Sequence, residues 1–336
     1  MNLDWKNLGF DQIPTAGAIR VDCEDGVWGE PTIMTEPTLE LHMGAQALHY
    51  GQACFEGLKA FTRKDGSIAL FRPEMNARRM LSSADRICMT APSEELFVAA
   101  CKKGVELNKA YVPPYGTGAS LYVRPLLIGT EPMFPIRPSR TYTFLVMVSP
   151  VGPYYKAGFS PVKALVVEDY DRAAPAGTGQ SKLAGNYAAS LKGSLDAKAK
   201  GFPIALYLDA REHKYIDEFG TSNFIGITGN GRYLTPDSPS VLPSITNDSL
   251  CHLASELNLT VLRQPIGIET IDQFTEVGAC GTAAIITPIA SITHGDKTIT
   301  FNNGEVGPVL KELYEKLKGI QYGDLVDKNN WMTPVA

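Results

Sequence analysis

The sequence predicts a mixed α/β (α+β) protein with two domains. Its 336 residues exceed what one compact core accommodates. Strand-like and helix-like segments alternate in both halves. Between the halves, residues 150–161 are rich in proline, glycine and tyrosine, which continue neither a helix nor a central strand. We therefore expect a smaller N-terminal domain at 1–149, a linker at 150–161 and a larger C-terminal domain at 162–336.

In the first half, short strands precede two helices and two longer β-rich segments. Asp65-Gly66 is a hairpin turn signal between two apolar stretches. Pro73 suits the first turn of a helix that contains Arg79, and Ser93 is a candidate N-cap for a second helix that ends near Lys109. The predicted strands cover 18–23, 38–42, 58–62, 67–71, 119–128 and 141–148.

In the second half, apolar strand candidates alternate with helical patterns. The strands are predicted at 162–167, 203–209, 223–228 and 283–289, and the helices at 187–200, 247–258 and 308–318. Each half therefore mixes sheet and helix.

Composition and charge exclude several classes of function. The net charge of -5, without a Lys/Arg run longer than a pair, offers no basic surface to nucleic acid or anionic lipid. The longest apolar run, 144–148, is too short to span a bilayer, and residues 1–15 lack the apolar core of a secretory signal. Six cysteines without a C-x-x-C pair or a nearby histidine cluster predict neither disulfides nor a metal site, so we expect a cytoplasmic protein.

Two short stretches carry candidate chemistry. Lys182 lies in Ser181-Lys182-Leu183-Ala184-Gly185-Asn186-Tyr187, just before a predicted helix, and its amine is the group that forms a Schiff base with an aldehyde cofactor. Glu218 precedes an apolar strand, where a buried carboxylate would suit a pyridine nitrogen. Taken separately, a solvated loop lysine and a loop acid or helix cap are the simpler interpretations. Gly177-Thr178-Gly179 lacks the spacing of either nucleotide-binding glycine motif.

Several such stretches in one order make a stronger pattern. They are 48–57 (LHYGQACFEG), 71–80 (FRPEMNARRM), 122–125 (YVRP), 182–187, 218–223 and 281–284 (GTAA). In this order the sequence resembles the branched-chain amino acid aminotransferases of the type IV pyridoxal phosphate (PLP) fold. That resemblance implies two domains with sheets or barrel-like sheets and helices, and PLP in the cleft between them.

The resemblance also implies a role for each cofactor-binding residue. Lys182 would be the Schiff-base lysine and the proton shuttle, Glu218 the partner of the pyridinium, and Tyr187 the partner of the ring phenolate oxygen. Arg79 would bind the phosphate together with the first turn of a helix that opens at Ile245. The cofactor-binding set implied in this way is Arg79, Lys182, Tyr187, Glu218, Thr221, Ser244, Ile245, Thr246 and Thr282.

Substrate binding is implied in the same way. One pocket has to accept a branched aliphatic side chain in one half-reaction and the charged side chain of glutamate in the other. Tyr50, Phe55, Tyr122 and Tyr154 would form its wall, Arg124 would meet the glutamate side-chain carboxylate, and the amides of Thr282 and Ala283 would hold the α-carboxylate. Ordinary strand packing is the alternative interpretation for these aromatic residues.

The activity implied is transamination of leucine, isoleucine and valine with 2-oxoglutarate, giving branched 2-oxo acids and glutamate by a ping-pong mechanism. A homodimer that shares its pocket across the interface is also implied. Rival interpretations are a D-amino acid aminotransferase or an aminodeoxychorismate lyase of the same fold, and a catalytically silent PLP-binding protein.

The sequence departs from the family pattern at three positions. Ala184 stands where glycine is usual, Ile225 where an aromatic residue is common, and Asn247 where a basic residue is usual. These departures affect side-chain preference and the geometry at the phosphate more than the reaction. The C-x-x-C pair of the mammalian enzymes is missing from 282–287, so thiol regulation of that kind is not expected.

Overall fold

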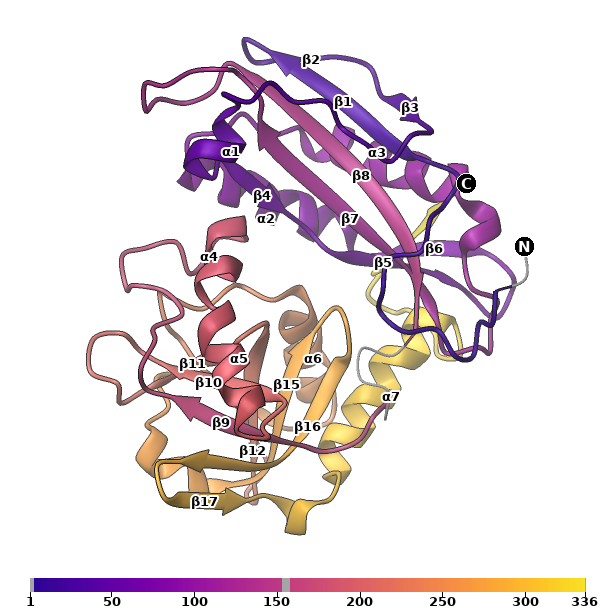
Figure 1. Cartoon of the computed structure of the whole chain (residues 1–336). Coiled ribbons are helices and arrows are strands. Elements are labelled where there is room, and N and C mark those ends of the chain that lie inside the picture. Colours follow the sequence, from indigo (N-terminus) through magenta and orange to yellow (C-terminus); the bar gives the residue numbers. More distant parts are fainter. Residues whose placement is uncertain (1–2, 153–157, 336) are drawn as a thin grey trace. The chain divides into compact units, whose positions relative to one another are not determined.

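The computed structural model describes residues 3–152 and 158–335. The chain folds into two compact units (Figure 1). Unit 1 comprises Met1–Lys156, Ser181–Gly185 and Ile320–Ala336, and unit 2 comprises Ala157–Gln180 and Asn186–Gly319. This division differs from the predicted domains at two segments, because Ser181–Gly185 and the C-terminal residues group with unit 1 through backbone pairing with its strands.

Unit 1 is built on a largely antiparallel sheet, as its alternating strand patterns indicate. Among the described residues, the strand order is β18-β6-β5-β7-β8-β1-β2, with β3 beside β1 and β4 beside β7 (Figure 1). The bounds are β1 (Ala18–Glu24), β2 (Val27–Trp28), β3 (Thr32–Met34), β4 (Ala53–Phe55), β5 (Leu58–Thr62), β6 (Ile68–Phe71), β7 (Ser120–Gly129), β8 (Thr141–Val151) and β18 (Met332–Val335).

The helices of unit 1 are α1 (Gln46–Tyr50), α2 (Pro73–Arg86), α3 (Glu94–Leu107) and the 3₁₀ turn η1 (Lys109–Tyr111). The predicted helix starts are confirmed. Pro73 is the first residue of α2, and Ser93 caps α3 because its hydroxyl accepts from the Leu96 amide. Both helices bury apolar residues against the sheet, with Met80 and Phe97 in the shared core. Arg79 lies in α2, as predicted.

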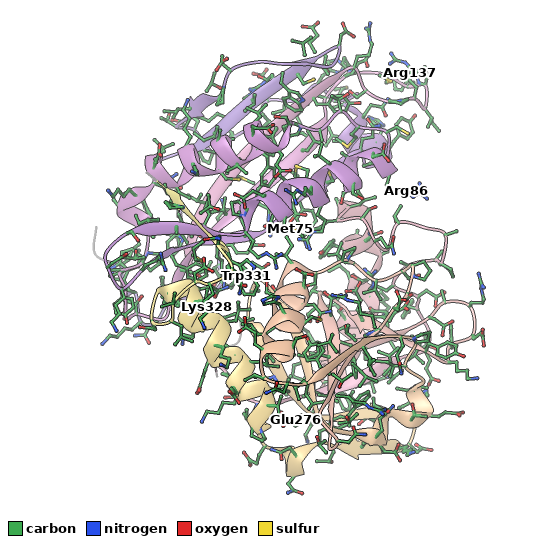
Figure 2. The ribbon with its side chains drawn as sticks, turned by 180° about the vertical axis from the view of Figure 1, so that it is seen from behind. Met75, Arg86, Arg137, Glu276, Lys328 and Trp331 are labelled. Atoms are coloured by element: carbon green, nitrogen blue, oxygen red, sulfur yellow. The ribbon has the colours of Figure 1, made fainter. Side chains whose placement is uncertain are left out.

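The C-terminal strand β18 completes the edge of this sheet. It pairs with β6, and Trp331 just before it stacks edge-on against Phe71 and lies under the Arg72 guanidinium, 5.2 Å from the ring centroid. Figure 2 labels Trp331 and, on α2, Met75. The sequence did not predict this strand, because four residues that include a proline are too few to show a period of two.

Two predictions in unit 1 are wrong. Residues 38–42 form no strand, and the short β3 at 32–34 pairs with β1 instead. β8 does not end at 148 but continues through Pro150 to Val151. Proline is tolerated at position 150 because β1 pairs with β8 only as far as Val146. Among the described residues, Pro150 therefore has a strand neighbour on the β7 side alone, and on its other side no strand requires the N–H that proline lacks.

Unit 2 contains a closed ring of strands. The order β11-β10-β9-β16-β15-β12 is closed by an additional β11–β12 pairing, which confirms the barrel-like sheet (Figure 1). β13 and β14 extend from β12, and β17 pairs with β16. The bounds are β9 (Val162–Val167), β10 (Ile204–Leu208), β11 (Ile216–Phe219), β12 (Ser222–Thr228), β13 (Arg232–Thr235), β14 (Thr260–Arg263), β15 (Phe274–Gly281), β16 (Ile285–His294) and β17 (Lys297–Thr300).

The helix predicted at 187–200 is two helices, α4 (Ala184–Ala189) and α5 (Leu191–Ala199). At the break, the Ser190 hydroxyl donates to the Tyr187 carbonyl, and the Ser190 carbonyl accepts from the Tyr207 hydroxyl. These bonds compete with the helical ladder. The remaining helices are α6 (Ile245–Glu256), α7 (Pro308–Tyr322), η2 (Ile268–Gln273) and η3 (Asn302–Gly304).

A buried carboxylate fixes the start of α7. Glu276 on β15, labelled in Figure 2, accepts from the Val309 and Leu310 amides at 3.1 and 2.9 Å. This satisfies two of the amides that a helix N-terminus leaves without intrahelical acceptors. No helix in the described parts of the chain combines the length and apolarity needed to cross a membrane.

Candidate active site

The candidate site in unit 1 lies where the strand pairing along β7 is interrupted between β4 and β5. β4 and β5 pair with β7 in a single register, Phe55 opposite Leu126 and Leu58 opposite Val123. The ladder is broken at Glu56-Gly57, opposite Arg124-Pro125, because Pro125 has no N–H to give. The Glu56 amide still donates to the Pro125 carbonyl at 2.8 Å.

The backbone of Lys182 is hydrogen-bonded beside this interruption. Its carbonyl accepts from the Phe55 amide at 3.1 Å, and its amide donates to the Ser83 hydroxyl of α2 at 2.9 Å. Its Nζ lies 5.0 Å from the centroid of the Phe55 ring. Lys182 precedes the first residue of α4 by two positions, in agreement with the prediction that it stands before a helix.

The surroundings of Lys182 favour its neutral amine. Burial, together with the positive charges of Arg79 and Arg124, lowers the pKa of the Lys182 ammonium to about 8, whereas Glu56 and Tyr122 act in the opposite direction. At neutral pH a larger share of this side chain is therefore unprotonated than in an ordinary lysine. A free amine is the form that attacks an aldehyde carbon.

Arg79 forms a two-pronged ion pair with a residue that the sequence did not single out as functional. Its Nε donates to Glu56 Oε1 at 2.8 Å and its Nη2 to Glu56 Oε2 at 2.7 Å. The side chains are 10% and 0% exposed, so the charges compensate each other away from water.

Arg124, Tyr122 and Phe55 lie together on one face of the sheet. Arg124 lies against both rings, 4.9 Å from the Phe55 centroid and 5.2 Å from the Tyr122 centroid, and its Nη2 donates to the Tyr122 hydroxyl at 3.1 Å. Its Nε is buried without a hydrogen-bond partner among the described residues. Gly57 makes room for Tyr122, because a Cβ there would lie 2.0 Å from the tyrosine oxygen. Arg124 therefore keeps hydrogen-bonding capacity that suits a carboxylate.

In unit 2, Glu218 is a buried carboxylate held by N–H donors of the protein. Arg172 Nη2 lies 2.7 Å from its Oε1, the Leu242 amide donates to Oε1 at 3.0 Å, and Asn223 Nδ2 donates to Oε2 at 3.2 Å. Arg172 also donates to the carbonyls of Gly179 and Ser240. The carboxylate lies within β11, one pair before the turn into β12, so it precedes the apolar strand as predicted.

The predicted phosphate-binding residues of unit 2 lie at the start of α6 and in nearby turns. α6 begins at Ile245, as predicted, and Ser244 caps it by accepting from the Asn247 amide. The amides of Ile245 and Thr246 have no acceptor within the helix, which makes this end suitable for an anion. Thr221 lies at the β11–β12 turn, and its carbonyl approaches Gly281, the residue before Thr282.

Thr282 and Ala283 lie in the turn between β15 and β16. β16 was predicted to start at 283 but begins at Ile285, whose φ of +63° is unusual for a β-branched residue. Tyr187 lies half-buried in α4. In that helix, Asn186 exchanges hydrogen bonds with Thr178 of the Gly177-Thr178-Gly179 segment.

One predicted wall residue is not part of the Lys182 cluster. Tyr50 is 42% exposed on α1, and its hydroxyl donates to the Phe134 carbonyl at 2.6 Å. Tyr154 falls outside the described residues. The sequence missed Glu56, Asn76 and Arg172, although a glutamate within an apolar strand line and an arginine ten residues before the lysine were available signals.

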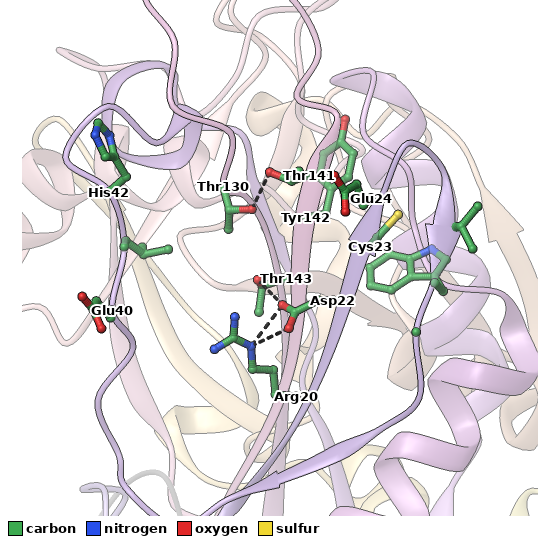
Figure 3. A pocket seen from close by; sticks show the side chains of 14 residues that line it. Arg20, Asp22, Cys23, Glu24, Glu40, His42, Thr130, Thr141, Tyr142 and Thr143 are labelled. Atoms are coloured by element: carbon green, nitrogen blue, oxygen red, sulfur yellow. Dashed lines mark hydrogen bonds and ion pairs between the residues drawn. The ribbon is translucent and has the colours of Figure 1, made fainter.

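A separate pocket of about 650 Å³ lies along β1 and β8 of unit 1 (Figure 3). Arg20, Asp22 and Thr143 are linked by hydrogen bonds there, as are Thr130 and Thr141. None of the predicted site residues lines it. The described residues contain no cluster of three or more His, Cys, Asp or Glu side chains that could hold a metal ion, and all six cysteines are free thiols.

Comparison with known proteins identifies the family. Residues 53–292 match the family model for class IV amino-transferases, which is more than half of the chain. The chain belongs to the class IV aminotransferases. The predicted resemblance and the predicted type of enzyme, an aminotransferase, are thereby confirmed.

Individual class IV aminotransferases match almost end to end. A branched-chain-amino-acid aminotransferase of Haemophilus influenzae is 47% identical over 99% of both chains, and one of Helicobacter pylori is 44% identical over 100% of this chain and 98% of its own. The Escherichia coli branched-chain amino acid aminotransferase structure has a TM-score of 0.81 at 27% identity, covering 96% of this chain and all of that one. A solved branched-chain amino acid aminotransferase from T.th., with pyridoxamine 5'-phosphate, has a TM-score of 0.77 at 25% identity, covering 94% of this chain and 98% of that one.

We expect the Lys182 side chain of the cofactor-free protein to titrate near pH 8, because burial and two arginines disfavour its charge. Acetylation with acetic anhydride, followed by peptide mass spectrometry between pH 6 and about 11, gives the midpoint, which for an ordinary lysine is about 10.4. A midpoint at that ordinary value would contradict the environment described for Lys182.

Proposed function

We propose that this protein transfers the amino group of leucine, isoleucine or valine to 2-oxoglutarate with PLP as its cofactor, by a ping-pong mechanism. The observation that supports this most strongly is the half-buried Lys182, with a lowered pKa and with Arg79, Phe55 and Arg124 around it. The names of the relatives and the pyridoxamine phosphate in one solved neighbour agree with the proposal.

The residues fit the chemistry of the cofactor. When bound, PLP supplies an aldehyde that accepts the amino group and a protonated ring that withdraws electrons from the α-carbon. Lys182 offers a neutral amine for the aldehyde. Glu218 offers a buried carboxylate for the ring nitrogen, with Arg172 and two N–H donors compensating its charge. Tyr187 is proposed to donate to the ring oxygen.

Lys182 also moves the proton in this proposal. With cofactor and substrate bound, its Nζ would be the base that takes the proton from the substrate α-carbon and the acid that later gives the proton back. A pKa near neutrality suits both directions, because neither protonation state is then rare.

The phosphate is proposed to bind Arg79, the amides at the start of α6, and the hydroxyls of Ser244, Thr246, Thr221 and Thr282. Arginine and helix N-terminal amides are the donors that a phosphate dianion requires. Asn247, which stands where a basic residue is usual in the family, instead bonds to the Tyr233 hydroxyl and to Thr235, so it contributes to the core of unit 2.

Substrate choice is proposed to rest on an aromatic wall with one charged partner. Phe55 and Tyr122 offer apolar surface to a branched side chain, and Arg124, with its unpartnered Nε, offers the glutamate side chain a charge. The Thr282 and Ala283 amides hold the α-carboxylate. Tyr154 is retained in the proposed wall by resemblance alone.

A visible absorption spectrum tests this function directly. We expect purified protein with PLP to be yellow, to lose the visible band on addition of L-leucine and to regain it on addition of 2-oxoglutarate, because the two half-reactions interconvert the aldehyde and amine forms of the cofactor. Bleaching by D-alanine or aminodeoxychorismate, but not by L-leucine, would favour the rival enzymes of the same fold. Absence of any half-reaction would favour a silent binder.

The matched control for this experiment is Lys182→Ala. It removes the base and leaves Arg79, Glu218 and the α6 amides in place, so the variant should still bind PLP but lose turnover by several orders of magnitude. Normal turnover in this variant would exclude the mechanism.

Arg124→Met tests the proposed dual specificity. Removing the charge should slow the half-reaction with 2-oxoglutarate by about 100-fold, the scale of a lost charge-assisted hydrogen bond, and change the half-reaction with L-leucine much less. Stopped-flow absorbance measures each half-reaction separately. Equal losses in both would show that Arg124 does not select the charged side chain.

We further propose that the protein is a cytoplasmic homodimer. Apolar side chains that are mostly exposed gather where α1 meets the segment before Arg137: Met43 (82%), Phe134 (80%) and Ile136 (84%), with Tyr50 hydrogen-bonded to Phe134. An exposed apolar cluster of this kind suits a second copy of the chain. Tyr50 is then available to the pocket of the partner subunit, and six free thiols fit a reducing compartment.

The double substitution Phe134→Ser with Ile136→Ser should shift the dimer toward the monomer, because it removes apolar area from the proposed interface. Sedimentation velocity at several protein concentrations measures the shift. The matched control, Val326→Ser, alters a side chain that is 78% exposed in another part of unit 1 and should leave the association unchanged. A wild-type monomer at micromolar concentration would refute the dimer.

A further inference from the structure

Glu56 is a fully buried carboxylate to which the proposed chemistry assigns no step. It is 0% exposed and accepts from four N–H groups: Nε and Nη2 of Arg79 at 2.8 and 2.7 Å, Nδ2 of Asn76 at 2.8 Å and the Gly57 amide at 3.3 Å. Asn76 and Arg79 are one turn apart on α2, so both point to the same place. A charge buried this deeply requires a reason to remain.

We propose that Glu56 is a positioning residue for Arg79, and that it determines which edge of the guanidinium a phosphate group meets. The proposal rests on the function proposed above, in which Arg79 binds the cofactor phosphate. Glu56 lies at the interruption between β4 and β5, and its side chain faces α2.

The ion pair divides the guanidinium into two edges. Glu56 occupies the Nε and Nη2 edge, so a phosphate cannot approach the guanidinium from that side. A planar guanidinium held in this way has lost its rotational freedom before the ligand arrives, so the ligand does not have to supply the ordering entropy.

Only a carboxylate can hold this set of donors. Both of its oxygens are acceptors, and all four partners are N–H donors. Glutamine would replace one oxygen by an NH₂ group and set donor against donor. Glu56→Gln therefore disturbs Arg79 while preserving the size of the side chain.

Two effects of Glu56→Gln have opposite signs. Releasing Arg79 from its fixed position weakens phosphate binding, whereas removing a negative charge near a dianion strengthens it. The sign of the change in affinity therefore decides between a positioning role and a simple charge effect. We expect weaker binding, because the Arg79 side chain is only 10% exposed and loses one of the two oxygens that accept from its Nε and Nη2.

The experiment compares PLP with pyridoxal, which lacks the phosphate, in spectroscopic titrations of the cofactor-depleted full-length protein. Glu56→Gln should raise the Kd for PLP about tenfold, the lower end of what outer-sphere substitutions cost at metal sites. The Kd for pyridoxal should stay within about twofold of wild type, the ordinary scatter of independent substitutions. Any effect of Glu56 on the Lys182 amine changes both ligands alike, so the ratio of the two Kd values isolates the phosphate.

A double-mutant cycle locates the effect in Arg79. In an Arg79→Ala background, Glu56→Gln should produce no further loss of PLP affinity, because the residue through which Glu56 acts is gone. Full additivity of the two losses would overturn the proposal. So would PLP binding that is unchanged or tighter in Glu56→Gln, or an equal loss for PLP and pyridoxal.

Glu131→Gln is the control for the loss of a glutamate–arginine pair in the same unit. Glu131 of unit 1 is paired with Arg137 at 2.8 Å and accepts from Arg140, and its own side chain is 10% exposed. This substitution should lower thermal stability without changing the ratio of the two Kd values. If Glu56→Gln fails to fold, Asn76→Ala, which removes one donor and no charge, decides: a selective loss of PLP affinity supports the proposal and an unchanged ratio overturns it.

The two proposals fail in different ways. Wild-type protein that binds neither PLP nor pyridoxal would refute the proposed function. If the wild-type protein binds PLP but the Glu56 variant keeps the wild-type ratio of the Kd values for PLP and pyridoxal, only the role of Glu56 is refuted.

Discussion

The structure of the candidate site in unit 1 depends on the balance of charges buried around Lys182. Arg79 and Arg124 place two positive charges beside the half-buried Lys182, and Glu56 is the carboxylate among the groups that act on it. Without that carboxylate, the cost of burying the Arg79 charge would fall on the fold. The same balance keeps the Lys182 amine neutral enough to react and Arg79 fixed on α2.

The backbone produces this balance by interrupting its own hydrogen bonding. A proline in the middle of β7 leaves a gap in the ladder between β4 and β5, and Glu56-Gly57 fills the gap. Glutamate takes the side that faces α2, and glycine leaves space for the Tyr122 ring on the other side.

In unit 2 the residue with the expected chemical role is a buried anion, and its partner is a cation. Its buried carboxylate, Glu218, is compensated by Arg172, which is fixed in turn by the carbonyls of Gly179 and Ser240. Gly179 is necessary here, because a Cβ at this position would lie 2.1 Å from the Ser240 oxygen. In each unit, therefore, a residue with an expected chemical role is held by a partner that has none of its own.

The sequence by itself determined the family, the residue types at the reacting positions and most of the elements, because local signals carry them: the Asp65-Gly66 turn, the Ser93 cap and the lysine before α4 all depend on near neighbours. Tertiary structure alone decided the rest. Pairing of Glu56 with Arg79 and of Glu218 with Arg172 joins residues 23 and 46 positions apart. The β9–β16 pairing of the barrel and the addition of β18 to the first sheet join strands far apart in the chain. Such contacts leave no period or spacing in the sequence, because they form only when segments that are distant in the chain pack together.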